Sequence, residues 1–197
     1  MIFLKDSKLY KVLRPILKCF TALFLRPNII GKDNIPKEVR IILAGNHTHI
    51  LDCLLLMSST KRSVHFLAKK ELWNGPKKVI FGNMGLIPVD RKKKNPEALA
   101  KAKECLNDNK IICIFPEGTT EKGRGLLPFK MGAVKIARDT NTKIVPFAIS
   151  GSYKIFNRNL TIQFGIPIKL ENDDLEEENN KLRNVIKQMM KDGEVNE

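Results

Sequence analysis

A histidine and an aspartate five positions apart, His47 and Asp52, are the residues of this chain best suited to acid–base chemistry. An imidazole with an unperturbed pKa of about 6.5 takes up a proton readily near neutral pH. A carboxylate on its other ring nitrogen fixes the tautomer and stabilises the imidazolium. Neither residue resembles a covalent nucleophile. The pair therefore predicts a general base that activates a hydroxyl group carried by the substrate.

The two side chains meet only if the chain turns between them, because five helical steps would separate them by about 140°. We expect His47 in the turn after a strand that ends at residue 44, and Asp52 one turn inside the next helix. The alternative is a capping histidine and a solvated aspartate. His49 adds a possible metal site, but zinc-type spacing is missing and His65 is the one other histidine, so no metal is expected.

A second motif, FPEGTT at residues 115–120, directly follows an apolar run. Proline ends a strand, and Gly118 lets the backbone approach a ligand closely. Glu117 would then stand at the carboxyl edge of a sheet, where ligands bind in α/β folds. The alternative is a surface turn with a solvated glutamate.

Two further motifs lie on either side of the second. GLIPVDR at residues 85–91 ends in Arg91, and an arginine can bind phosphate through two parallel hydrogen bonds. The lysines at 92–94 are expected to be solvated. VPFAI at 145–149 has a proline in a strand-like run, which indicates a sheet edge, a bulge or a strand start.

The elements that must position these motifs alternate between β-rich runs and helical stretches. Strands are expected at residues 40–44, 64–67, 86–90, 111–115, 143–149 and 160–164, and helices at 50–58, 96–107, 130–139 and 174–190. The alternation predicts an α/β fold with a mostly parallel, mixed sheet flanked by helices, and active groups on the loops after strands.

Residues 8–25 are expected to form an amphipathic helix, with leucine, isoleucine, valine and phenylalanine opposite lysine and arginine. Pro15 should kink or split it. This pattern suits a helix in a lipid interface, and the alternative is a surface helix packed on the core. No transmembrane helix is expected. We therefore divide the chain into a membrane-interface segment, 1–26, and a catalytic domain, 27–197.

The charge distribution points to an anionic partner. The net charge is +14, and because residues 170–197 hold nine acids and four bases, residues 1–169 carry +19. Such a body attracts nucleic acid, anionic lipid or phosphorylated substrates. Nucleic acid is not expected, because aromatic and basic residues are not interleaved. The four cysteines form no CxxC pair, which fits a reducing, cytoplasmic setting.

Taken in order, the four motifs resemble those of the glycerolipid acyltransferase family, whose bacterial members acylate 1-acyl-glycerol-3-phosphate. The family pattern NHxxxxD matches residues 46–52, G-x-x-F/P-V/I-D-R matches 85–91, FPEGTR matches 115–119, and VP matches 145–146. AKKEL at 68–72 and FKMG at 129–132 also match. Together, four ordered motifs are far more specific than any one alone.

The resemblance implies a glycerolipid acyltransferase fold and transfer of a fatty acyl group, without an acyl-enzyme, to the 2-hydroxyl of 1-acyl-sn-glycerol-3-phosphate. The donor would be acyl-CoA or acyl carrier protein, no cofactor is implied, and backbone N–H groups near Gly118 would stabilise the oxyanion. The resemblance makes His47 the base and Asp52 its partner. The substrate-binding residues it implies are Arg91, Glu117, Gly118, Thr119, Lys69 and Arg124.

One departure from the family pattern concerns the acceptor. The family has arginine after FPEGT where this chain has Thr120, so Arg124 or Lys122 would replace it. Another lyso-lipid, such as a lyso-ornithine lipid, or glycerol-3-phosphate remains an alternative acceptor. A non-catalytic module for anionic membranes and a hydrolase are alternatives from other classes. The enzyme interpretation places the chain peripherally at the cytoplasmic face of a membrane, in contact with lysophospholipid, acyl donor and anionic lipid.

Overall fold

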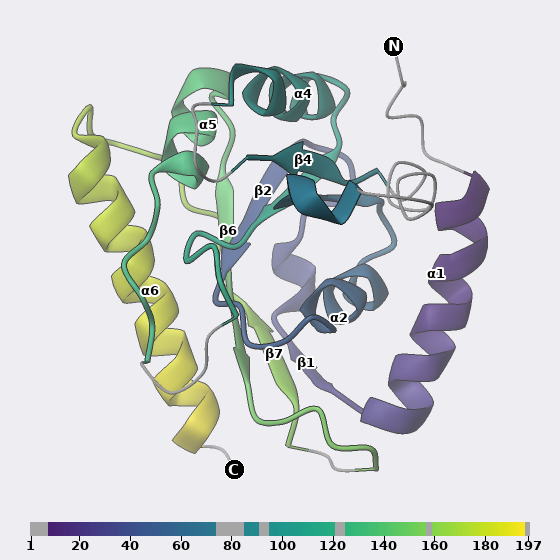
Figure 1. Cartoon of the computed structure of the whole chain (residues 1–197). Coiled ribbons are helices and arrows are strands. Elements are labelled where there is room, and N and C mark those ends of the chain that lie inside the picture. The colour runs from purple at the N-terminus through teal and green to yellow at the C-terminus, as the bar shows by residue number, and fades with distance from the viewer. Residues whose placement is uncertain (1–7, 74–84, 91–94, 121–124, 157–158, 196–197) are drawn as a thin grey trace.

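The computed structural model describes residues 8–73, 85–90, 95–120, 125–156 and 159–195, which form a seven-stranded sheet with helices on both faces (Figure 1). Its strand order is β1-β7-β6-β2-β5-β3-β4. The strands are β1 Asn28–Ile30, β2 Ile41–Gly45, β3 Val64–Lys69, β4 Ile87–Val89, β5 Ile111–Ile114, β6 Ile144–Ser150 and β7 Thr161–Phe164. Only β6 and β7 pair antiparallel among these described strands. The predicted mostly parallel, mixed sheet is confirmed.

Two helical layers cover the sheet. The α-helices are α1 Lys8–Phe20, α2 Asp52–Ser59, α4 Pro96–Asn107, α5 Gly132–Thr140 and α6 Leu175–Val195. The described residues also contain three short helical turns: a π-helical turn, η1 Thr21–Leu25, and two 3₁₀ turns, η2 Lys32–Asn34 and η3 Lys70–Trp73. Side chains of α2 and η1 pack into one core, and side chains of α4, α5 and α6 pack into a second.

Side chains of strand β2 contribute to both cores. All five of its residues are buried. Ile41 and Leu43 belong to the core beside α2, whereas Ile42 and Ala44 belong to the core beside α4, α5 and α6. Successive side chains of a strand point to opposite faces, so a strand covered on both faces is a continuous apolar run. This places the carboxyl end of β2 between two rigid layers.

Most predicted elements are present with shifted ends. The helix expected to begin at residue 130 begins at Gly132, and the one expected to end at 190 continues to Val195. Strand β1 was not predicted, because three residues are too few for a recognisable alternation. Pro15 lies within a single helix, α1, so of the two expected effects, a kink or a split, the split does not occur.

The N-terminal helix α1 turns a large apolar stripe outward. Val12, Ile16 and Phe20 of α1 are exposed, as is Leu23 of the following η1, and 60% of the Val12 surface is accessible. On its inner side Leu17 packs against the core beside α2, and the Arg14 Nε donates a hydrogen bond to the Thr60 carbonyl at 2.9 Å. The helix thus packs on the core through part of its apolar surface, and its place in a lipid interface stays a prediction. None of the described helices has both the length and the hydrophobicity to cross a bilayer.

Candidate active site

The loop between β2 and α2 is anchored at its first residue. Asn46 is buried, and its Nδ2 donates to the Ile149 carbonyl at 2.8 Å while its Oδ1 accepts from the Ile149 N–H at 2.8 Å. This double hydrogen bond ties the end of β2 to the neighbouring strand β6. The backbone position of the next residue, His47, is thereby fixed.

The His47 and Asp52 side chains meet as the sequence predicted. Nδ1 of His47 lies 2.8 Å from Oδ2 of Asp52, which is fully buried. A carboxylate only accepts hydrogen bonds, so Nδ1 carries the proton and Nε2 is the nitrogen left to take another. Asp52 is the first residue of α2, not one turn inside it, because the loop itself makes the turn that brings the two together.

The Asp52 carboxylate is held by several further donors. Its Oδ2 accepts the backbone N–H groups of Thr48 and His49 at 2.7 and 3.0 Å. Its Oδ1 accepts the hydroxyl groups of Thr48, at 3.2 Å, and of Tyr153. These hydrogen bonds give both oxygens of the buried carboxylate partners and restrict its geometry.

Tyr153 is a site residue that sequence reasoning missed. It lies three residues after the end of β6, and its ring stacks on His49 with the centroids 4.8 Å apart. Burial, followed by the charge of Asp52, raises the pKa of the Tyr153 hydroxyl well above its ordinary value. The phenol therefore stays protonated and always donates to Asp52. Because β6 pairs with β2, the loop after β6 lies beside the loop that carries His47, and this position could have indicated Tyr153.

Replacing Tyr153 with phenylalanine is expected to lower kcat about tenfold, with KM nearly unchanged, because a hydrogen bond to a charged group contributes roughly 1.5–3 kcal/mol. The ring that stacks on His49 is retained, so the change tests the hydroxyl alone. Steady-state kinetics across pH measure the effect, and thermal melting reports the fold separately. A kcat equal to that of the unmodified chain would show that the hydroxyl has no influence on the pair.

A stacking contact on one face of the His47 ring helps to fix its orientation. The imidazole lies on the Phe115 ring with centroids 3.9 Å apart and planes 15° apart. Phe115 in turn meets the Phe147 ring edge-on at 5.9 Å. Only 12% of the His47 side chain is accessible. The ring is therefore oriented by Asp52 at one edge and by Phe115 at one face.

Glu117 lies where the sequence predicted but uses its carboxylate on the backbone. Its Oε1 accepts from the His47 N–H and its Oε2 from the Leu127 N–H, both at 3.0 Å. Glu117 thus joins the catalytic loop to the segment around residue 127. Gly118 has φ +71°, and its N–H donates to the Phe115 carbonyl, so this N–H closes a turn rather than facing an oxyanion.

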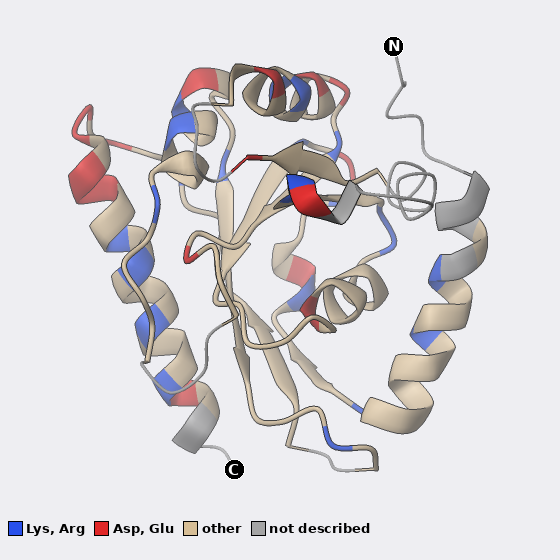
Figure 2. Cartoon of the chain, in the orientation of Figure 1, with Lys and Arg blue, Asp and Glu red and all other residues tan. Residues whose placement is uncertain are grey.

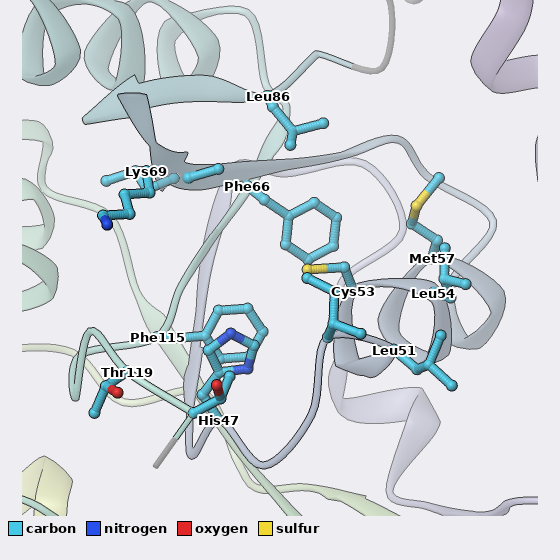
Figure 3. Close-up of a pocket in the computed structure, with 14 residues that line it drawn as sticks. His47, Leu51, Cys53, Leu54, Met57, Phe66, Lys69, Leu86, Phe115 and Thr119 are labelled. Atoms are coloured by element: carbon cyan, nitrogen blue, oxygen red, sulfur yellow. The ribbon is translucent and has the colours of Figure 1, made fainter. Parts of the chain in front are cut away.

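His47 stands between two pockets of different character. One, of about 440 Å³, is lined mainly by apolar side chains (Figure 3). The other, of about 270 Å³, is lined by Leu126, Met190 and His47 together with the polar residues Asn46, Thr48, Glu117, Ser152 and Tyr153, after which we call it the polar pocket. The first suits an apolar ligand, whereas the second offers hydrogen-bonding side chains. The imidazole lines both pockets.

The apolar pocket contains one thiol but no activated nucleophile. Cys53, Leu54 and Met57 of α2 line it opposite Phe66 of β3. Burial, and then the Asp52 charge, raises the pKa of Cys53 to about 12. A thiol in this state stays protonated at neutral pH and is inert. The site therefore has the chemistry of a general base and lacks that of an acyl-cysteine.

The remaining predicted residues divide into two groups. Thr119 and Lys69 line the apolar pocket, and Lys69, the last residue of β3, also lies 3.5 Å from Glu71. Arg91, Arg124 and Lys122 lie outside the described residues. Over the described ranges no three His, Cys, Asp or Glu side chains gather as metal ligands.

Known proteins are similar to this chain in sequence. The family model described as Acyltransferase matches residues 26–150. The 1-acyl-sn-glycerol-3-phosphate acyltransferase of Borreliella burgdorferi is 31% identical over 143 residues, covering 71% of this chain and 57% of that protein. The protein of the same name from Helicobacter pylori is 41% identical over 123 residues, covering 59% of this chain and 51% of that protein.

A solved structure has the same fold as this chain. The crystal structure of the 1-acyl-sn-glycerophosphate (LPA) acyltransferase PlsC from Thermotoga maritima superposes with a TM-score of 0.71 at 23% identity, covering 91% of this chain and 78% of that one. This likeness shows a common fold. The chain spans only 57% and 51% of the length of the two curated relatives above.

Proposed function

Because this chain belongs to the acyltransferase family, we propose that it moves a fatty acyl group from a thioester donor to the 2-hydroxyl of 1-acyl-sn-glycerol-3-phosphate, forming phosphatidic acid. Two curated relatives that carry the name of this activity support the acceptor. The observation that carries the proposal is the His47–Asp52 pair at the junction of an apolar and a polar pocket.

The proposed reaction uses His47 twice. Nε2 takes the proton of the acceptor hydroxyl as its oxygen attacks the thioester carbonyl, and a C–O bond forms. The C–S bond of the tetrahedral intermediate then breaks, and the leaving thiolate takes the proton from the imidazolium. Asp52 stabilises the imidazolium between the two steps, since its buried charge lies 2.8 Å from Nδ1.

The apolar pocket would hold the acyl chain during transfer. Its walls come from α2, β3 and the residues before β4, and Leu54 is only half-buried there. The donor that delivers the chain, acyl-CoA or acyl carrier protein, is proposed from the family resemblance. The polar pocket beside Tyr153 would receive the glycerol end of the acceptor. The substrate-binding roles that stay predictions are those of Arg91, Glu117, Gly118, Thr119, Lys69 and Arg124.

Replacing Leu54 with tryptophan is expected to shift chain-length preference toward shorter acyl groups, because the larger ring fills part of the apolar pocket. The ratio of kcat/KM for a long over a short acyl donor should fall on the order of tenfold, since each excluded methylene is worth roughly 1–3 kcal/mol. Leu54→Met, which conserves volume, is the matched control and should keep the ratio. An unchanged ratio in the tryptophan variant would place the acyl chain elsewhere.

The proposed activity is tested by product analysis. A labelled acyl donor is incubated with 1-acyl-glycerol-3-phosphate, with glycerol-3-phosphate and with a lyso-ornithine lipid, and the lipids are separated by thin-layer chromatography. Labelled phosphatidic acid is expected. Product from another acceptor alone would favour the alternative that Thr120 leaves open, and free fatty acid alone would indicate a hydrolase.

A peripheral position at an anionic, cytoplasmic-face membrane is part of the proposal. Both lipid substrates reside in a bilayer, and the chain carries a net charge of +14. The apolar stripe of α1 faces away from the core, as an interfacial helix requires. Lysophospholipid, acyl donor and anionic lipid are therefore the partners we propose.

A further inference from the structure

Two segments that are distant in sequence form one exposed apolar rim. The Phe156 N–H donates to the Phe24 carbonyl at 2.8 Å, and the two rings lie 5.9 Å apart. This contact joins the loop after β6 to the end of α1 and η1. We call the combined surface the apolar rim; its exposed members are Val12, Ile16, Phe20, Leu23, Ile155 and Phe156.

The rim residue Phe156 is exposed in an unfavourable backbone conformation. It adopts φ +63°, a left-handed conformation that is unfavourable for a bulky side chain, while 63% of its surface is accessible. The Arg26 guanidinium lies over its ring at 5.9 Å. Backbone strain that presents an aromatic side chain to solvent indicates a binding role for that side chain.

A basic pocket adjoins this rim. It has a volume of about 480 Å³, and its lining includes the cations Lys18, Arg26 and Lys32 and the hydroxyls of Thr21 and Ser58, with no acid among the described residues that line it. Besides its contact with the Phe156 ring, Arg26 donates from Nε to the Leu23 carbonyl, and its terminal N–H groups make no hydrogen bond to the described residues and so remain for an anion. Basic but no acidic residues appear on the described part of α1 (Figure 2).

We propose that this basic pocket binds the phosphate headgroup of an anionic phospholipid while the apolar rim enters the same leaflet. Three converging cations supply the charge for a phosphodiester, and the rim supplies the apolar area that interfacial binding needs. The inference rests on the proposed membrane association and gives it a lipid specificity and a place on the chain.

The position of the pocket relates it to the active site. Ser58 of α2 lines the basic pocket, while Cys53, Leu54 and Met57 of the same helix line the apolar pocket beside His47. A headgroup bound at Lys18, Arg26 and Lys32 would therefore place the bilayer against one side of α2, with the acyl pocket on another.

The test compares two triple variants of equal charge in vesicle flotation. One neutralises the pocket, Lys18→Gln with Arg26→Gln and Lys32→Gln. The control neutralises three exposed lysines of α5 and α6, across the sheet from α1, Lys135→Gln with Lys187→Gln and Lys191→Gln. Vesicles contain phosphatidylcholine alone or phosphatidylcholine with phosphatidylglycerol, and circular dichroism confirms that both variants are folded.

The pocket variant should lose binding to phosphatidylglycerol vesicles on the order of 100-fold, because each cation near an anionic surface contributes about fivefold. The control should lose much less. Ile155→Ser with Phe156→Ser should weaken binding at high salt too, since apolar insertion is not screened. Inorganic phosphate at constant ionic strength should leave vesicle binding unchanged.

Equal losses in the two triple variants would overturn the proposal, because binding would then follow net charge alone. Displacement by inorganic phosphate would assign the pocket to a soluble anion and overturn the lipid assignment. Flotation needs no turnover, so a His47→Ala protein should float like the unmodified chain. Failure of the catalytic proposal is therefore distinguishable from failure of this one.

Discussion

Replacing His47 with alanine is expected to lower kcat for acyl transfer about 10²–10⁴-fold, the usual contribution of a general base. The alanine leaves no group at the position of Nε2 to take the proton of the acceptor hydroxyl. KM should change little, since the walls of both pockets remain. Single-turnover and steady-state assays with a labelled thioester donor measure the loss.

His49→Ala is the matched control for that experiment. It removes an imidazole from the same loop, but the His49 ring contacts Tyr153 and the Leu51 N–H rather than Asp52. Its activity should stay within about tenfold of the unmodified chain, since it lacks the base role. If His47→Ala kept activity in that same range while folded, His47 would not be the base.

The contact between His47 and Asp52 could be predicted from the sequence because it is local. Only six residues lie between the end of β2 at Gly45 and the start of α2 at Asp52, and so short a loop leaves few ways to place the two side chains. The direction of Glu117 could not be predicted in this way. Its place at the sheet edge followed from the apolar strand before it, but the choice of the His47 and Leu127 N–H groups depends on how two distant loops meet.

Neither the role of Tyr153 nor the orientation of α1 could be predicted from the sequence pattern, for two different reasons. Tyr153 reaches Asp52 only because β6 lies beside β2, which is a property of the sheet order. The four-residue spacing of Val12, Ile16 and Phe20 predicts an amphipathic helix, but the same spacing is compatible with a buried or an exposed apolar face. Tertiary packing decides between them, and here Leu17 takes the inner position.

Replacing Asp52 with asparagine is expected to lower kcat roughly 10³–10⁴-fold with the fold retained, because the change removes the charge opposite the imidazolium. The surroundings can accept the amide. Its oxygen can replace Oδ2, which takes the Thr48 and His49 N–H groups, while its NH₂ group replaces Oδ1 and donates to the Thr48 and Tyr153 hydroxyls. Thermal melting should therefore change little while turnover falls, and a variant that unfolds would show instead that the charge is structural.

The double variant Asp52→Asn with Tyr153→Phe separates positioning from independent action. If Tyr153 works by orienting the charged carboxylate, its loss should matter about tenfold in the unmodified chain and much less once the charge is gone, since residues that act as one unit are not additive. Equal effects in both backgrounds would mean that Tyr153 acts on the substrate through the polar pocket it also lines. The coupling measured in this cycle therefore decides whether the catalytic unit has two members or three.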